Sequence, residues 1–281
     1  MIGFLQVFWN ASTRLTYDGG LANAGNIALS LLLSLFPFMI LIATFVDVWG
    51  DPTLLEEILV LMFDHWPAGS AAPIAEQMKI VLGQAKGELI TIGNLIALVL
   101  ATNGIESARD GLNRAYRFVE TRNFMFRRLQ GAIFVCIGAL GLILAAFILV
   151  GTPVVWSFLV SKLSWLSQFS FAVGLVQYGL AILLLVTALF CFHYFLPAGS
   201  LKGGEVIWGI LLTIAGILIG SQFFAIYLKE FANYTNLYAG LAGVMIVIVY
   251  LYCLSVLILF GAEFNAALKH YRSGSQKTNM S

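Results

Sequence analysis

The sequence predicts an all-α, polytopic membrane protein with six transmembrane helices and both termini in the cytoplasm. The chain of 281 residues is 60% hydrophobic and only 10% charged, whereas soluble domains carry about 25% charged residues. Its mean hydropathy is +0.92. Six apolar segments are long enough for a helix to cross a bilayer, which takes about 20 residues. Lysine and arginine are concentrated on one side of these segments, and that bias sets the predicted orientation.

The six segments are expected to be helices because a bilayer core offers no partner to an unpaired backbone group. The second becomes polar at Asn103, so we expect its helix to continue beyond the bilayer edge. The last is longer than a span requires and should be tilted or protrude. We interpret residues 1–272 as one transmembrane domain and residues 273–281 as a disordered tail. The predicted spans cover residues 25–47, 89–108, 130–151, 172–196, 205–228 and 237–268.

The first span carries a polar stripe and a proline. Asn26, Ser30 and Ser34 recur every four residues and therefore share one helix face. Pro37 lacks a backbone donor and should kink the helix. The stripe has two interpretations: serines that bond to backbone or bridge helices, or a cavity wall with a hinge at Pro37.

The first outer segment, residues 48–88, is the longest loop. Its apolar residues recur at helical spacing on both sides of His65-Trp66-Pro67. This pattern predicts two short amphipathic helices on the outer face. The segment is also the candidate surface for a partner.

Residues 103–128 are rich in arginine and predict a polar helix between two apolar ones. They hold six of the 15 Lys and Arg residues. Glu106–Arg109 is an i, i+3 pair and Asp110–Arg114 is an i, i+4 pair. In both the acid comes first, an order that favours ion pairing within a helix.

Two interpretations of this segment stay open. It is either a solvated cytoplasmic helix that obeys the positive-inside rule, or Arg109, Asn113 and Arg114 face a cavity that binds an anionic group. Guanidinium groups match the geometry of phosphate, and basic pockets at helix ends bind lipid headgroups. The partners expected on the second interpretation are membrane lipids, with anionic lipids the leading class.

The last span ends in polar residues, Glu263 and Asn265. An ionisable residue in a membrane segment is costly and motivates a functional hypothesis. Lys269 or an arginine of residues 103–128 is the expected partner of Glu263, either in a structural salt bridge or in a gating pair. His193 lies near Cys191 in the fourth span, but no second histidine or carboxylate lies at metal-ligand spacing, so it is interpreted as a core histidine. Small residues predict close helix packing at Gly216, Gly220, Gly240 and Gly243.

The orientation follows from counting the cations in each set of loops. With the N-terminus inside, eleven Lys and Arg fall on the cytoplasmic side and four on the outer side, which accounts for all 15. The N-terminal residues lack a basic stretch followed by a cleavage site, so no removable signal peptide is expected.

Three motifs together resemble the YihY/BrkB family of bacterial inner-membrane proteins. They are the stretch from Ala28 to Pro37, the stretch from Leu112 to Tyr116 with Glu120 and Arg122, and Tyr238, Gly240 and Gly243 leading into Gly261 to Asn265. The sequence departs from the family pattern at Leu29, Ser30, Ala239 and Tyr250. The resemblance covers almost the whole chain and implies a six-helix protein of the bacterial inner (plasma) membrane. It also implies a transporter, with movement of lipids among its suggested activities.

The leading functional prediction is a transporter or flippase-like protein for an anionic amphiphile such as a lipid. The alternative is a non-transporting membrane scaffold or envelope-assembly factor. The family has carried a ribonuclease label, but the sequence shows no cluster of metal ligands, so we expect no enzyme activity and no nucleic-acid partner. Nucleotide-binding and metalloprotease motifs are also missing, so no cofactor or metal is expected. Helix faces made of small residues suit contacts within the bundle and contacts between protomers equally, so a homo-oligomer stays open. Residues expected to line the substrate path are Arg109, Asn113, Arg114, Glu263, Asn265, Asn26, Ser34 and Pro37.

Overall fold

A computed structural model of the chain describes residues 2–49, 90–231 and 241–278, and all regular elements within these ranges are helices. The predicted all-α class is therefore confirmed for the described part of the chain. The amphipathic helices and the partner surface predicted in residues 48–88 fall almost wholly outside the described residues.

Five helical stretches among the described residues are long and apolar enough to cross a membrane. They overlap the first, third, fourth, fifth and sixth predicted spans. The second predicted span lies in α5 (Ile90–Tyr116), which is not among the five. The C-terminal half of α5 is polar and charged, so a count of six spans stays a prediction. The five stretches are Gly20–Ile42, Phe124–Lys162, Ser164–Phe195, Gly203–Tyr227 and Val244–Arg272.

Helices α2 (Gly20–Trp49) and α5 form an antiparallel pair. The hydroxyl of Thr44 bonds to Asn94 near one end of the pair, and the hydroxyls of Ser30 and Ser107 bond to each other nearer the other end. Between them, Gly104 lies against Ser34, where an added Cβ would come within 3.3 Å of the Ser34 hydroxyl oxygen. The absence of a side chain at Gly104 therefore lets the two helices approach closely.

Helices α9 (Gly203–Phe231) and α10 (Leu241–Thr278) cross at a second glycine contact. A Cβ at Gly209 would clash with the Gly261 carbonyl, and a Cβ at Gly261 would clash with the Thr213 hydroxyl. Gly216 also packs closely, since a Cβ there would come within 2.6 Å of Leu257. The predicted packing role of Gly216 is thus confirmed, and Gly240 lies outside the described residues.

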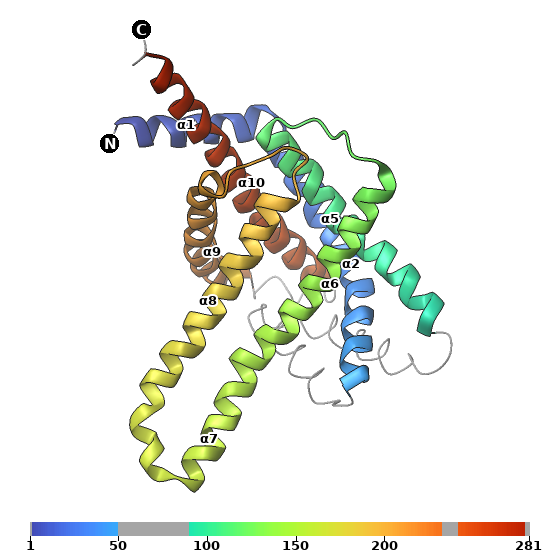
Figure 1. Cartoon of the computed structure of the whole chain (residues 1–281), viewed down its shortest axis with the longest axis vertical. Coiled ribbons are helices and arrows are strands. Elements are labelled where there is room, and N and C mark those ends of the chain that lie inside the picture. The colour runs from blue at the N-terminus through green and yellow to red at the C-terminus, as the bar shows by residue number, and fades with distance from the viewer. Residues whose placement is uncertain (1, 50–89, 232–240, 279–281) are drawn as a thin grey trace.

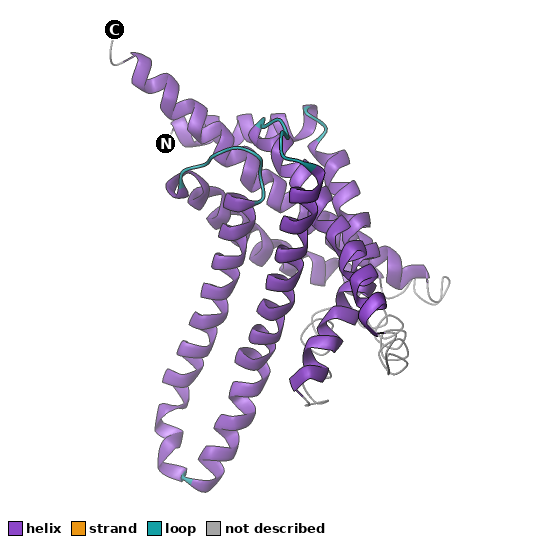
Figure 2. Cartoon of the chain, turned by 45° about the vertical axis from the view of Figure 1, so that its right-hand side comes forward, coloured by secondary structure: helices purple, strands orange, loops and turns teal. Residues whose placement is uncertain are grey.

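A long hairpin extends away from the other helices (Figures 1 and 2). Its first arm is α6 (Phe124–Ala146), a π-helical turn (Phe147–Gly151) and α7 (Thr152–Lys162). A short turn of helix (Ser164–Phe169) leads into its second arm, α8 (Ser170–Phe195). Most large apolar side chains of both arms are exposed, as expected of surfaces that contact lipid.

The described chain begins and ends in helix. Residues 2–17 form a further helix, α1 (Ile2–Tyr17), which lies across the end of α10 (Figure 1). Helix α10 continues to Thr278, where a disordered tail from residue 273 was predicted. The start of α1 and the end of α10 lie at the same end of the molecule, which we call the terminal end.

The main core lies toward the terminal end and joins α2, α5, α8, α9 and α10. Leu112, Leu196, Val206 and Leu259 are almost fully buried in it. The loops after α5 and α8 run over this end (Figure 2). The core therefore fixes the positions of the polar residues at the terminal end.

Candidate functional site

The arginine-rich segment is a helix, a loop and the start of another helix, and not the single helix that the sequence predicted. Helix α5 ends at Tyr116, and Arg117 takes a left-handed conformation with φ 60°. The Phe118 N–H then donates to the Asn113 carbonyl at 2.8 Å, which closes the helix end. The Asn123 side chain accepts from the Met125 N–H and caps the start of α6. The chain reversal places arginines of both helices around one centre.

Arg109 is fully buried between α5 and α6. Its Nη1 pairs with Glu106, which confirms the predicted i, i+3 pair. Its Nη2 donates to the Arg127 carbonyl at 3.1 Å and to Gln130 Oε1 at 3.2 Å. Burial lowers the pKa of Arg109, but an arginine stays charged at neutral pH. Arg109 therefore joins two helices.

Asn113 is also buried and links α5 to two loops. Its Nδ2 donates to Glu120 Oε2 at 3.0 Å, and its Oδ1 accepts from the Ala198 N–H at 2.6 Å. Glu120 in turn accepts from Arg122 Nε at 2.8 Å and from Arg122 Nη2 at 2.7 Å. These hydrogen bonds from Arg122 are the main cause that lowers the pKa of Glu120 to about 2.

Arg122 and Gln130 also bond to backbone carbonyls at the end of α8. Arg122 Nη2 donates to the Leu196 carbonyl at 3.0 Å, and Gln130 Nε2 donates to the Phe195 carbonyl at 2.7 Å. The last carbonyls of a helix have no partner within it, so these bonds replace missing ones. Gln130 Oε1 also accepts from Arg122 Nη1 at 3.0 Å. The arrangement fastens the first arm of the hairpin to the second.

Arg114 differs from its neighbours because its side chain is exposed. The ion pair predicted between Asp110 and Arg114 is not found among the contacts of the described residues, and Asp110 is exposed as well. Of the three residues predicted to bind an anion, Arg114 is thus the only one open to solvent.

Glu263 is buried in α10 and pairs with Arg117, whose Nη1 lies 2.7 Å from Glu263 Oε2. The prediction that an arginine of residues 103–128 meets Glu263 is therefore confirmed. Arg117 Nη2 also lies 2.6 Å from Asp18, in the turn between α1 and α2. Lys269, the other predicted partner, bonds to Glu205 at 3.0 Å. The choice between a structural bridge and a gating pair stays open.

Asn265 belongs to a chain of buried hydrogen bonds. Its Oδ1 accepts from the Gly209 N–H at 2.6 Å, and its Nδ2 donates to the Val206 carbonyl at 3.0 Å and to the Tyr116 hydroxyl at 3.2 Å. The Tyr116 hydroxyl lies 2.9 Å from His193 Nδ1. Which of these two atoms donates is set by the tautomer of His193.

His193 itself is fully buried, so the predicted core histidine is confirmed. Its Nε2 has no partner among the described residues. Through this chain, α5, α8, α9 and α10 meet around Tyr116, a residue that the sequence analysis did not single out as a site. Its signal was weak because a single tyrosine at a helix end is common.

The polar stripe of the first span divides into two parts. The Ser34 hydroxyl donates to the Leu100 carbonyl at 3.3 Å and accepts from the Gly104 N–H at 3.0 Å, and Ser30 bonds to Ser107 at 2.7 Å. Both serines therefore bridge α2 and α5, as one of the two interpretations predicted. Asn26 is exposed, and Pro37 lies inside the continuous helix α2.

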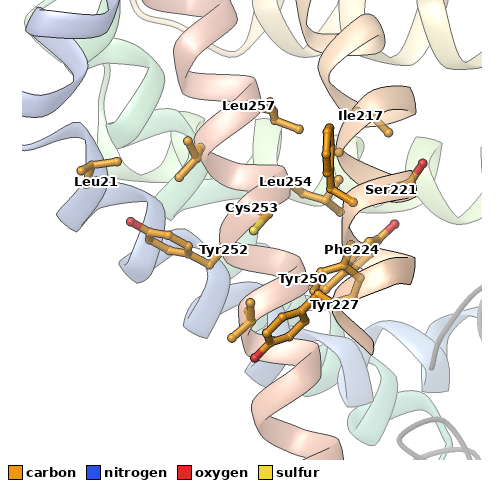
Figure 3. Close-up of a pocket in the computed structure, with 14 residues that line it drawn as sticks. Leu21, Ile217, Ser221, Phe224, Tyr227, Tyr250, Tyr252, Cys253, Leu254 and Leu257 are labelled. Carbon is orange, nitrogen blue, oxygen red and sulfur yellow. The ribbon is translucent and has the colours of Figure 1, made fainter. Parts of the chain in front are cut away.

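Two cavities are described, and neither is lined by the eight predicted path residues. The smaller, of about 40 Å³, lies inside the bundle and is lined almost entirely by apolar side chains. The larger, of about 550 Å³, lies between α9 and α10 (Figure 3). The small residues Gly220 and Ser221 lie along it, and the ring of Tyr250 is tilted against that of Phe224 with their centroids 5.3 Å apart. The role of the predicted path residues stays a prediction.

Another residue missed by the sequence analysis is Arg14, near the end of α1. Its buried Nη1 has no hydrogen-bond partner among the described residues, and it lies within electrostatic range of Glu263. The described residues contain no group of three or more His, Cys, Asp or Glu side chains that could hold a metal.

Comparison with known proteins supports the resemblance noted from the motifs. The chain is 28% identical over 257 residues to the ribonuclease-like protein YfkH of Bacillus subtilis, covering 91% of this chain and 92% of that protein. It is 24% identical over 283 residues to a UPF0761 membrane protein of Vibrio atlanticus, covering 99% and 87%. No solved structure matches the chain. The sequence model of the Virulence factor BrkB family matches residues 11–281. With its apolar helices, the chain is a multi-pass membrane protein and belongs to the Virulence factor BrkB family.

Proposed function

We propose that this protein binds an anionic amphiphile, such as a phospholipid, and moves it across the bacterial inner membrane. The observation that carries the proposal is the apolar cavity of about 550 Å³ between α9 and α10. Small-molecule sites commonly measure about 300–1,000 Å³ and are mostly apolar. Since both walls belong to helices long and apolar enough to span the membrane, hydrocarbon chains of lipids are the nearest ligands of suitable chemistry.

Charge near the cavity supports an anionic headgroup. The lining extends along α10 to Leu257, and Glu263 follows six residues later, a rise of about 9 Å. Arg14 lies within electrostatic range of Glu263 and keeps one buried donor without a partner among the described residues. A guanidinium with an unused donor favours phosphate or carboxylate. Arg14 therefore joins the predicted path residues as a candidate headgroup contact.

The first test is native mass spectrometry of the protein released from nanodiscs that contain phosphatidylglycerol and phosphatidylcholine. We expect phosphatidylglycerol to stay bound to the wild type. Gly220→Leu should remove it, because a larger side chain there enters the cavity. Gly138→Leu is the matched control, since a Cβ at Gly138 meets nothing within 4 Å. Equal retention in both variants would exclude the cavity as the lipid site.

The second test separates headgroup from chain. Arg14→Gln should reduce the preference for phosphatidylglycerol over phosphatidylcholine without emptying the cavity.

Arg109→Ala with Asn113→Ala tests the path residues predicted from sequence, with far-UV circular dichroism as a fold control because both side chains are buried. Translocation of fluorescent lipid in proteoliposomes, measured by dithionite bleaching, then tests movement. Bound lipid without translocation would reject the transport step.

One observation favours the alternative of a non-transporting scaffold. The polar groups of the terminal end mostly bond to one another: both terminal nitrogens of Arg109 and both polar atoms of the Asn113 amide have protein partners, and Arg109 Nε alone of these atoms has none among the described residues. On that alternative the protein holds envelope partners in place, and pull-down of such partners would accompany a failed translocation assay. We also propose that the protein is not an enzyme; metal-dependent cleavage of RNA by purified protein would contradict this.

A further inference from the structure

One side of α1 packs tightly on the terminal end of the bundle. Val7, Ala11 and Leu15 follow at intervals of four residues and are buried. Val7 and Ala11 belong to one apolar cluster with Phe264 of α10, and the ring of Phe8 lies 5.1 Å from that of Phe260. This side fixes α1 to α10 and needs no other partner.

The opposite side of α1 is uncovered and exposes two large apolar side chains. Leu5 is 62% exposed and Trp9 is 69% exposed, and their spacing of four residues places them on one face. The residues that flank them on this face, such as Gln6 and Thr13, are uncharged. Arg14 is the single charged residue of α1, and the helix contains no acid. Burial of the Leu5 and Trp9 side chains away from bulk water is therefore favourable.

The position of α1 shows what lies next to this face. Helix α1 ends at Tyr17, and the first candidate span begins at Gly20. Its contacts Phe260 and Phe264 lie within the candidate span Val244–Arg272, toward its C-terminal end. Figures 1 and 2 place α1 across the terminal end and not along the spans. The helix therefore lies at the depth where two spans leave the bilayer.

We propose that α1 is an interfacial helix whose Leu5–Trp9 face inserts into the lipid surface at the terminal end. Amphipathic helices of this kind lie in the plane of the interface with the apolar face buried about 5–10 Å deep. Tryptophan is enriched at this depth because its ring is apolar and its N–H polar. A helix with one cation and no acid also suits a leaflet that carries anionic lipid.

The anchored helix has a structural consequence within the protein. The turn that follows α1 contains Asp18, which pairs with Arg117, and Arg117 pairs with Glu263. Insertion of α1 into the lipid surface therefore also fixes the position of Asp18. Asp18 is the first residue of the ion-pair series that joins α5 to α10. This inference does not depend on the proposed transport.

The test uses nitroxide spin labels at single cysteines, in a variant whose three native cysteines are replaced and which is reconstituted in phosphatidylglycerol/phosphatidylcholine vesicles. The labels replace Leu5, Trp9, Thr121 and Ile137. Thr121 is an exposed loop residue at the terminal end, and Ile137 is an exposed apolar residue in the middle of α6. Collision rates with oxygen, which concentrates in lipid, and with a water-soluble nickel chelate are measured at each site.

We expect the ratio of oxygen to nickel collisions at positions 5 and 9 to lie well above the value at position 121 and below the value at position 137, as for a face buried at the interface. Nickel access at positions 5 and 9 equal to that at position 121 would show that the face is in water. Low collision rates with both reagents would show that protein covers it, for example a second copy. Either result would overturn the inference. Size-exclusion profiles like that of the parent protein confirm that each labelled variant is folded.

Discussion

At the scale of single residues, arginines at the terminal end serve as internal connectors. Arg122 bonds to Glu120, to Gln130 and to the carbonyl of the first residue after α8. Arg109 does the same between α5 and α6. A buried guanidinium left without partners would cost several kcal/mol, so these bonds are required for the helices to meet as they do.

Glu120→Gln should destabilise the protein at neutral pH by about 1–3 kcal/mol, because Arg122 loses its charged acceptor. The pKa of Glu120 is lowered from 4.5 to about 2. A lowered pKa means that its stabilisation is present above about pH 4.5 and is lost as the pH falls toward 2. Thermal unfolding in detergent at several pH values measures this. The midpoints of wild type and variant should converge in acid, and a constant difference would contradict the assignment.

Tyr116→Phe should also destabilise the protein, by about 1–3 kcal/mol, because it removes one hydrogen-bond partner from each of two buried groups. These groups are the Asn265 amide, which keeps its bond to Val206, and His193 Nδ1. Tyr17→Phe is the matched control, since Tyr17 is 86% exposed. A thermal midpoint of Tyr116→Phe equal to that of the control would show that the hydrogen-bond chain contributes nothing.

At the scale of elements, close contacts between helices depend on residues without side chains. The crossing of α9 and α10 is narrowest at Gly209 and Gly261, where backbone atoms of one helix touch the other. The same crossing places the Gly209 N–H within reach of Asn265 Oδ1. The close packing of α9 on α10 therefore also forms the buried hydrogen bonds of Asn265.

Gly261→Ala should lower the thermal midpoint strongly, because its Cβ would meet both Thr213 and the Gly209 backbone. Overpacking of this kind costs about 1–3 kcal/mol or more when a backbone must move. Gly25→Ala is the control, since a Cβ there meets nothing within 4 Å. An unchanged midpoint for Gly261→Ala in detergent would mean that the helices can separate at this point without loss.

At the scale of the whole molecule, the terminal end collects α1, the loops after α5 and α8, and the end of α10 (Figure 2). The turn of the hairpin, near Ser164, lies at the opposite end (Figure 1). The cation count predicts that the terminal end faces the cytoplasm.

A membrane-impermeant maleimide tests that orientation in spheroplasts. Single cysteines replace Thr121 and Ser164, both exposed, in the variant without native cysteines. We expect label on position 164 in intact spheroplasts and on position 121 only after the membrane is broken. The reverse pattern would place the terminal end outside.

The sequence by itself determined the class of protein and most of its helices. Long apolar segments can satisfy their backbone in a bilayer only as helices, so composition and length predicted them without knowledge of neighbours. Two ion pairs were also predictable, because an unpaired charge near a membrane boundary is costly. They are the pair Glu106–Arg109 and the pair of Glu263 with an arginine. The end of α5 was not, since the left-handed conformation of Arg117 carries no sequence signal of the kind that glycine would give.

Only the tertiary structure decided which polar groups meet. Tyr116 lies 77 residues from His193 and 149 residues from Asn265 in the chain, yet its hydroxyl bonds to both. Their partnership depends on how closely α9 and α10 cross and where α8 ends. These distances are set by packing of whole helices. Spacing along a sequence identifies the face on which a residue lies, whereas the group that it touches is fixed by the neighbouring helix.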